Sequence, residues 1–228
     1  MAGASTSWTF DELGHAGPEH LDPAYVAAYD EKSPTDWGEE VAELLRLGVG
    51  ATSTVVDFGA GTGAFACSIA PHVARVVAVD VSEAMVATMR GRGVEAVRAG
   101  FLSYEHEGEQ PDAVVTRNAL HHLPDFWKAI ALERVARLLQ AGGVLLLQDI
   151  VYSFELPDAG RAFAAWLASA PSDPSKGWTA EQLAEHVREE YSTFSWLLEP
   201  MLAQAGFDIR DRRLSTNGIN AAYTCIRL

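Results

Sequence analysis

The pattern of apolar and polar residues from Thr54 onward predicts an α/β fold. Short runs rich in Val and Leu are expected to form five strands, Thr54–Phe58, Arg75–Asp80, Val94–Ala99, Asp112–Arg117 and Gly143–Val151. Most of these runs lack strict alternation, as is typical of strands that are covered on both faces of a sheet. Segments with helical character lie between several of them, at Gly63–Ala70, Glu83–Arg90 and Asp125–Leu139. The pattern therefore predicts a doubly wound, mostly parallel sheet with right-handed crossovers.

The segments on either side of this pattern are expected to be elaborations of the same domain. Helices are predicted over Ala24–Tyr29, Trp37–Leu47, Leu156–Ala170, Thr179–Glu190 and Ser195–Ala205, and a closing antiparallel hairpin over Phe207–Leu214 and Ile219–Leu228. We expect one domain over residues 1–228, with a seven-stranded sheet, a tail and helices in residues 1–50, and a helical lid insertion in residues 152–205. The tail up to about Gly17 is expected to be mobile.

Composition limits the binding partners and the cellular compartment that we expect for this chain. The 228 residues carry a formal net charge of −14, and 48% of them are hydrophobic. A surface this acidic repels phosphate backbones, which argues against DNA or RNA as a partner. The chain begins without the basic and apolar regions of a signal peptide, and no stretch is apolar enough to span a membrane. Cys67 and Cys225 are expected to be core residues rather than a disulfide, so the features together indicate the cytoplasm.

The most informative stretch joins the first predicted strand to a helix. Asp57 precedes three glycines at alternate positions, Gly59, Gly61 and Gly63. Glycine permits a sharp turn and lets a ligand approach the backbone, while the helix that follows presents N–H groups and the positive end of its dipole. Such a turn also suits the pyrophosphate of a dinucleotide, so the motif alone is weak.

Two carboxylates sharpen this interpretation. Asp57 would attract an ammonium group and repel a pyrophosphate, and Asp80 ends the second predicted strand, where an acid accepts hydrogen bonds from both hydroxyls of a ribose. The set predicts a ligand with an amino acid and a nucleoside but no phosphate. The plain alternative is that Asp57 caps the next helix and Asp80 begins a turn. A nicotinamide-dependent dehydrogenase is a rival, although it favours G-x-G-x-x-G over the G-x-G-x-G found here.

On these residues the chain resembles the class I S-adenosylmethionine-dependent methyltransferases, in their small-molecule branch (type 11, ubiquinone-biosynthesis-like). Asp57–Gly63 is similar to the first motif of that family, the stretch from Asp112 to Asp125 to its fourth-strand motif, and Leu138–Gly143 to the turn before its fifth strand. The resemblance covers roughly Val41 to the C-terminus. It implies a Rossmann-like class I methyltransferase fold, S-adenosylmethionine as cofactor, and methyl transfer to a small molecule, with O- or N-methylation expected.

The expected cofactor-binding residues come from the turn, the strand ends and the N-terminal helices. They are Tyr29, Asp57, Gly59, Ala60, Gly61, Gly63, Asp80, Val81, Met85, Gly100, Phe101, Asn118 and Ala119. The resemblance implies that Val81 and Met85 flank the adenine. In one departure, the family usually has Gly-Asp after the third strand, with the acid accepting from the adenine amino group, whereas this chain has Gly100-Phe101. The Phe101 backbone amide and apolar packing would then hold the adenine.

The expected catalytic residues are His121 and Asp149. They follow the fourth strand and end the apolar part of the fifth, at the carboxyl edge where open α/β sheets bind ligands. Because these strands are neighbours in the class I order, Asp149 is expected to orient the imidazole, as in the His–Asp pair of some similar natural-product O-methyltransferases. His121 would then be the base for an acceptor whose proton must leave. The alternative is that His121 only lines the pocket through its backbone, while His122 packs or caps the next helix.

The lid insertion is expected to select the acceptor. Phe163, Trp166 and Trp196 are expected to pack rather than line a pocket, while the insertion as a whole indicates a lid over an apolar or aromatic acceptor. No metal is expected, because the histidines show no metal-ligand spacing. The acceptor, the methylated atom and the oligomeric state stay open. A noncatalytic S-adenosylmethionine-binding subunit is the alternative from another class, since methyl transfer needs few obligatory residues.

Overall fold

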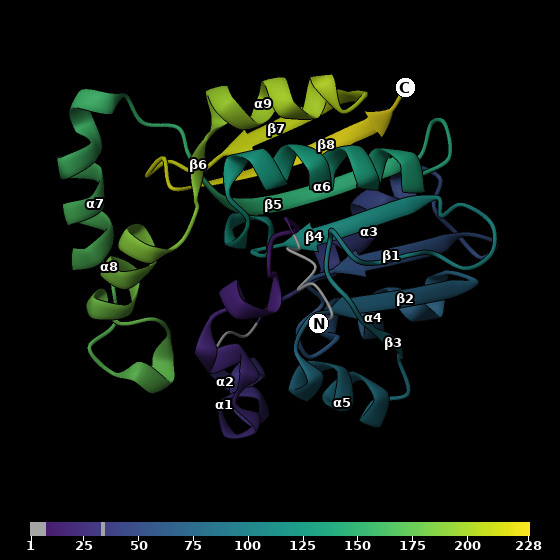
Figure 1. The fold of residues 1–228 in the computed structure, drawn as a ribbon, viewed down its shortest axis with the longest axis horizontal. Helices are drawn as coiled ribbons and strands as arrows, with labels where there is room; N and C mark the ends of the chain where they lie inside the picture. Colours follow the sequence, from purple (N-terminus) through teal and green to yellow (C-terminus); the bar gives the residue numbers. More distant parts are fainter. Residues whose placement is uncertain (1–7, 33–34) are drawn as a thin grey trace, which may run out of the picture.

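The fold is built on one mostly parallel sheet. The computed structural model describes residues 8–32 and 35–228 (Figure 1). Its strands are β1 Thr54–Phe58, β2 Arg75–Asp80, β3 Glu95–Arg98, β4 Ala113–Arg117, β5 Val144–Tyr152, β6 Thr193–Phe194, β7 Phe207–Leu214 and β8 Asn220–Arg227. The spatial order is β3-β2-β1-β4-β5-β8-β7, in which β1 to β5 are parallel and β8 runs antiparallel to both of its neighbours. The predicted class I sheet and its closing antiparallel hairpin are confirmed.

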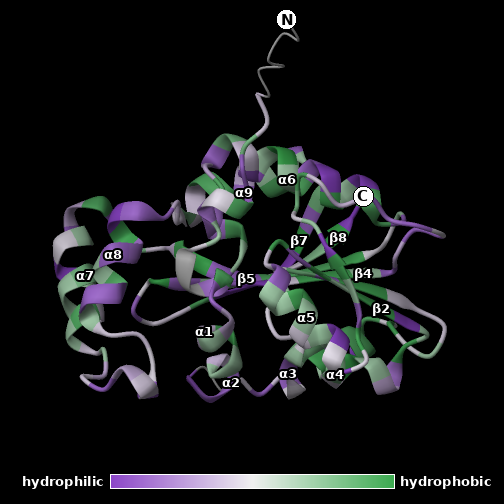
Figure 2. Ribbon diagram, turned by 60° about the horizontal axis from the view of Figure 1, so that its bottom comes forward, coloured by the Kyte–Doolittle hydropathy of each residue, from purple (hydrophilic) through white to green (hydrophobic). Residues whose placement is uncertain are grey.

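Helices cover both faces of this sheet. One face carries α3 Gly38–Arg46, α4 Ala64–Ile69 and α5 Glu83–Gly91, and the other carries α6 Asp125–Leu138 and α9 Ser195–Gln204. In β1, Val55 packs with the α3 and α4 side chains while its neighbour Val56 belongs to the core formed with α6 and α9. Both valines are fully buried, which explains why the strand shows no polar alternation. In Figure 2 the hydrophobic colour accordingly runs along the central strands.

The N-terminal helices are shorter than the sequence predicts. The Asp22 side chain accepts from Ala24 N at 2.9 Å and so caps α1, Pro23–Ala27, and a separate turn, α2 Tyr29–Lys32, follows it. Before them the chain forms 3-10 helices at Leu13–His15 and Pro18–Leu21. The part of the mobile-tail prediction that concerns residues 1–7 lies outside the described residues.

The predicted lid stands beside the sheet, beyond the carboxyl end of β5 (Figure 1). It begins with a 3-10 turn, Leu156–Asp158, followed by α7 Ala159–Ala168, a 3-10 turn at Pro174–Lys176 and α8 Ala180–Glu189. A capping box starts α8, with Thr179 and Gln182 each bonding to the other's backbone N–H. The chain then returns through β6, which the sequence analysis missed and which pairs with the last residues of β5. Among the helices that the structure describes, none combines the length and hydrophobicity that crossing a bilayer requires.

Candidate active site

The glycine turn lies at the carboxyl edge of β1 and leaves no room for a Cβ at Gly59 or Gly63. Gly59, Gly61 and Gly63 all have positive φ angles, of 65°, 56° and 80°. A Cβ on Gly59 would lie 2.2 Å from Cβ of Ala119, which follows β4. Glycine is therefore required here both by the left-handed backbone and by the close approach of the neighbouring strand end.

Two carboxylates flank this turn, the buried Asp57 and the partly buried Asp80. Asp80 accepts from Gly61 N at 2.9 Å and from Ser82 N at 2.8 Å, and burial raises its pKa to about 6. Asp57 is 4% exposed, and its Oδ2 has no hydrogen-bond partner among the described residues. Burial, and secondarily the negative charge of Asp80, raise the Asp57 pKa well above its usual range. A buried carboxylate without a partner fits a site that receives a cation.

A small cavity of about 60 Å³ adjoins Asp80 at the ends of β2 and β3. It is lined by Glu12, Ala16, Gly59, Asp80, Val81, Ala99, Gly100, Phe101, Ala119, His122 and Leu123. Met85, a buried residue of α5, does not line this cavity. The Phe101 ring stacks on Phe58 with centroids 4.9 Å apart, so it belongs to the core.

The sequence analysis missed Glu12 in this cavity. Its carboxylate accepts from Leu102 N at 3.0 Å and lies against Gly100. In the family that this chain resembles, an acid usually follows this glycine directly, at the position of Phe101. Burial raises the pKa of Glu12. The tail that carries it has no helical or strand pattern, so only the folded chain shows that its acid meets the end of β3.

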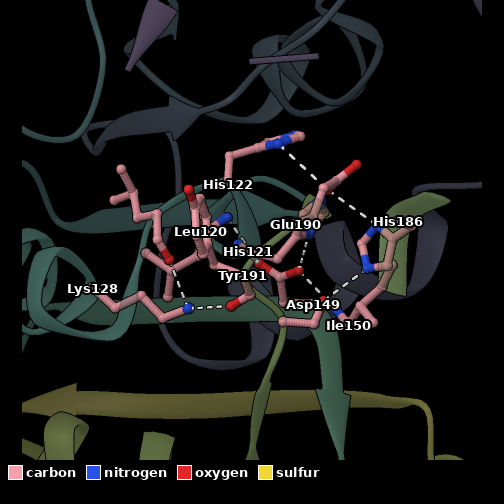
Figure 3. A network of polar contacts seen from close by, with 11 residues as sticks. Leu120, His121, His122, Lys128, Asp149, Ile150, His186, Glu190 and Tyr191 are labelled. Atoms are coloured by element: carbon pink, nitrogen blue, oxygen red, sulfur yellow. Dashed lines mark hydrogen bonds and ion pairs between the residues drawn. The ribbon is translucent and has the colours of Figure 1, made fainter. Parts of the chain in front are cut away.

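The predicted pair of His121 and Asp149 is in direct contact. His121 lies in the 3-10 turn Leu120–His122, and its Nδ1 is 2.5 Å from Asp149 Oδ1 (Figure 3). The other Asp149 oxygen accepts from the backbone N–H groups of Leu120 at 2.8 Å and His121 at 3.2 Å. The parallel register of β4 and β5 brings the two residues together. Three hydrogen bonds to a carboxylate that is 2% exposed fix the imidazole and its backbone as one unit.

A second carboxylate, Glu190, reaches His121 from the lid. Its Oε2 lies 2.9 Å from His121 Nε2 and 3.5 Å from His122 Nδ1. Burial alone would lower the His121 pKa, but the charges of Asp149 and Glu190 raise it to about 9. Burial, helped by the neighbouring His121, lowers the His122 pKa to about 3. The two adjacent histidines therefore favour opposite protonation states at neutral pH.

A cavity of about 520 Å³ adjoins these residues, between the sheet edge, the N-terminal helices and the lid. Its lining includes Tyr29, Asn118, His121, His122, Trp166, Trp178, Gln182, Glu185, His186, Glu189, Glu190 and Tyr191. Trp166 thus lines the cavity, contrary to the packing prediction. Phe163 does pack, against Tyr152 and Phe154, while Trp196 is 55% exposed and stacks on Phe194.

His121, His186 and Glu190 are the described residues whose nitrogen and carboxylate atoms could share one metal ion. No metal was expected from the sequence, although His186 and Glu190 have the i, i+4 spacing of ligands on one helix face; only the fold brings the third residue, His121, from the end of β4 to join them. A buried lysine, Lys128, links the segment after β4 to the lid. Lys128 Nζ donates to Leu123 O at 2.7 Å, to Asp125 Oδ1 at 2.9 Å and to the carbonyl of Tyr191, which follows Glu190.

Comparison with known proteins agrees with this geometry. Residues 55–143 match a family model described as a methyltransferase domain. The chain is 26% identical over 184 residues to an uncharacterized methyltransferase of Bacillus pumilus, covering 80% of this chain and 82% of that one. It is 29% identical over 157 residues to one of Mycobacterium tuberculosis, covering 60% and 77%. These matches support an S-adenosylmethionine-dependent methyltransferase with the class I fold.

Solved methyltransferases share the fold of this class I enzyme. Magnesium protoporphyrin IX methyltransferase from Synechocystis, solved with bound S-adenosylmethionine, is 15% identical with a TM-score of 0.66, covering 98% of this chain and 100% of that one. The N-methyltransferase NodS from Bradyrhizobium japonicum, solved with S-adenosylhomocysteine, is 18% identical with a TM-score of 0.57, covering 90% and 99%. S-adenosylmethionine is therefore the cofactor of this methyltransferase, and the partnerless Asp57 beside the glycine turn fits its ammonium group.

Proposed function

We propose that this methyltransferase modifies a small molecule, at oxygen or nitrogen, in the 520 Å³ cavity beside His121. The cavity carries the proposal, because its volume is in the range of small-molecule sites and it adjoins the cofactor turn through Tyr29 and Asn118. Its walls combine two tryptophans with the carboxylates of Glu185, Glu189 and Glu190. Such walls favour a neutral or cationic acceptor with an apolar part.

The cofactor supplies the methyl group, and the chain's own residues bind and orient it. We assign the ammonium group to Asp57, the ribose hydroxyls to Asp80, and close backbone contact to the turn from Gly59 to Gly63. Val81, Gly100 and Ala119 line the space for the adenine. Glu12 is the acid nearest to that space on the β3 side, so we assign it the adenine amino group in place of the missing Gly-Asp acid.

On the acceptor side we propose that His121 is the catalytic residue and Asp149 its positioning residue. The contact with Asp149 holds Nδ1, which leaves Nε2 directed toward Glu190 and the cavity. At that nitrogen the neutral form of His121 would take the acceptor's proton, and the raised pKa of His121 means that this form gains population as the pH approaches about 9. Holding the acceptor beside the cofactor turn, in a cavity closed by the lid, supplies the orientation on which methyl displacement depends.

Labelling with tritiated S-adenosylmethionine tests this proposal. A cell extract is separated by size into metabolites and macromolecules, and each fraction is incubated with the enzyme. We expect label to enter the metabolite fraction with the wild-type chain and not with Asp80→Asn. Label entering only the macromolecular fraction would overturn the small-molecule assignment.

The acceptor-side assignment needs its own variants. His121→Gln is expected to lower the rate at saturating cofactor about 100-fold or more, while the affinity for S-adenosylhomocysteine stays within twofold. Asp149→Asn is expected to lower kcat more than it raises KM, because it disturbs the orientation of the imidazole rather than acceptor binding. A wild-type rate in a folded His121→Gln enzyme would show that His121 only lines the pocket.

A further inference from the structure

Three potential metal ligands from separate segments converge at the wall of the acceptor cavity. Glu190 Oε2 lies 2.9 Å from His121 Nε2 and 3.0 Å from His186 Nδ1, and the three atoms lie within 4.8 Å of one another (Figure 3). His121 follows β4, whereas His186 belongs to the last turn of α8 and Glu190 directly follows that helix. The cluster therefore depends on the docking of the lid against the sheet edge.

In each imidazole, the outer ring nitrogen contacts a neighbouring side chain, and the inner ring nitrogen faces Glu190 Oε2. Asp149 Oδ1 binds His121 Nδ1 at 2.5 Å, and Ser192 Oγ lies 2.8 Å from His186 Nε2. Metal-binding histidines usually have such a partner on the nitrogen that does not ligate, because it sets the tautomer and the ring orientation. In the neutral imidazole with its outer nitrogen protonated, His121 Nε2 and His186 Nδ1 each present a lone pair, so an ion would bind His121 by displacing the Nε2 proton that the neighbouring carboxylates favour.

The Oε2 atom of the Glu190 carboxylate lacks a well-aligned hydrogen bond among the described residues. This oxygen is buried and has no contact of full hydrogen-bond geometry within the described chain, although His121 Nε2 and His186 Nδ1 lie close enough to lower the pKa of its carboxyl despite that burial. A buried oxygen in this position is costly unless something satisfies it. A cation placed among the three atoms would satisfy the oxygen and both nitrogens at once.

We propose that His121, His186 and Glu190 bind a divalent first-row transition metal ion. Two histidines and one carboxylate form a triad that leaves other coordination positions open. Metal–ligand bonds of about 2.1 Å at right angles place neighbouring ligand atoms about 3.0 Å apart. The two short separations in the cluster, 2.9 Å and 3.0 Å, match that spacing.

The open positions face the cavity, so the ion would bind an oxygen of the acceptor. This part rests on the proposed function, and it narrows the acceptor to a molecule with a hydroxyl or similar oxygen donor. A bound divalent cation lowers the pKa of an attached O–H group, as zinc lowers that of water from about 15.7 to about 7. The proton would pass to solvent, and His121 would promote its loss as a ligand of the ion rather than as a free base.

Binding of Zn²⁺ to the full-length, metal-stripped protein tests the site. We expect one equivalent by calorimetry, and Co²⁺ in its place should give visible absorption bands of nitrogen and oxygen ligation. Glu190→Gln and His186→Ala should each weaken Zn²⁺ binding by more than about tenfold. The exposed His72 provides the matched control, and His72→Ala should bind as the wild type does.

Affinity for S-adenosylhomocysteine, measured on the same samples, reports whether each variant is folded. The inference is overturned if wild-type protein that binds S-adenosylhomocysteine takes up no stoichiometric Zn²⁺ or Co²⁺, or if Glu190→Gln binds Zn²⁺ as tightly as the wild type. Failure of the proposed function would give a different result: the metal-loaded enzyme would transfer no label to any metabolite fraction. If labelling is the same with and without bound metal, the acceptor-binding part is refuted and the metal site stands on its binding data.

Discussion

Replacing Asp80 with asparagine tests the cofactor assignment with the least disturbance of the fold. The carboxylate already accepts from Gly61 N and Ser82 N, and we assign it the two ribose hydroxyls in addition. Asparagine keeps the shape but loses the charge and one acceptor oxygen. A hydrogen bond to a charged group contributes about 1.5–3 kcal/mol, so losing that contribution should weaken binding about 10- to 150-fold.

The assay is calorimetric titration with S-adenosylhomocysteine at pH 8, where the Asp80 carboxyl, with a pKa of about 6, is ionised. Asp211→Asn, at an exposed position of β7, is the control and should bind as the wild type does. The wild-type affinity should fall as the pH drops through about 6, because the protonated carboxyl accepts fewer hydrogen bonds; Asp80→Asn should show less of this fall. Binding within twofold of the wild type by a folded Asp80→Asn protein would refute the ribose assignment.

Three further substitutions probe the turn, the tail and the lid. Gly59→Ala should lower the free energy of unfolding by about 2–4 kcal/mol in chemical denaturation, because φ is positive there and the new Cβ meets Ala119; an unchanged midpoint would contradict this. Glu12→Gln should weaken S-adenosylhomocysteine binding about 3- to 10-fold by calorimetry, since an amide is a weaker acceptor for the adenine amino group; unaltered affinity would remove Glu12 from the site. Lys128→Met should cost about 2–4 kcal/mol in urea unfolding, because it leaves buried carbonyl groups without a donor; a loss below about 0.5 kcal/mol would show that these bonds are dispensable.

Local sequence patterns were sufficient for the central sheet and for the glycine turn with its two flanking carboxylates. The limits of β1, β2 and β7 agree with the prediction. For β1 the reason is that a strand covered on both faces needs a continuous apolar run, which a turn then ends. The edge strand β7 is mostly exposed, and its limits follow from the turns on either side of it. The turn around Gly59 was readable for a similar reason, since a left-handed backbone between a strand and a helix selects glycine. The contact of His121 with Asp149 followed from strand order, because neighbouring parallel strands end at the same edge.

Only the tertiary structure decided which residues complete the site. Glu12 lies in a tail without periodicity, and it reaches the end of β3 through contacts between residues 90 positions apart. His186 and Glu190 carry an ordinary helical pattern, and their chemistry depends on how α8 docks beside β4. The local pattern of a helix indicates which face is buried but not which segment covers that face, because docking is set by packing between distant segments. For this methyltransferase, the sequence indicated the cofactor and the fold, while the packing of the tail and lid determined the cavity beside His121 and the residues that line it.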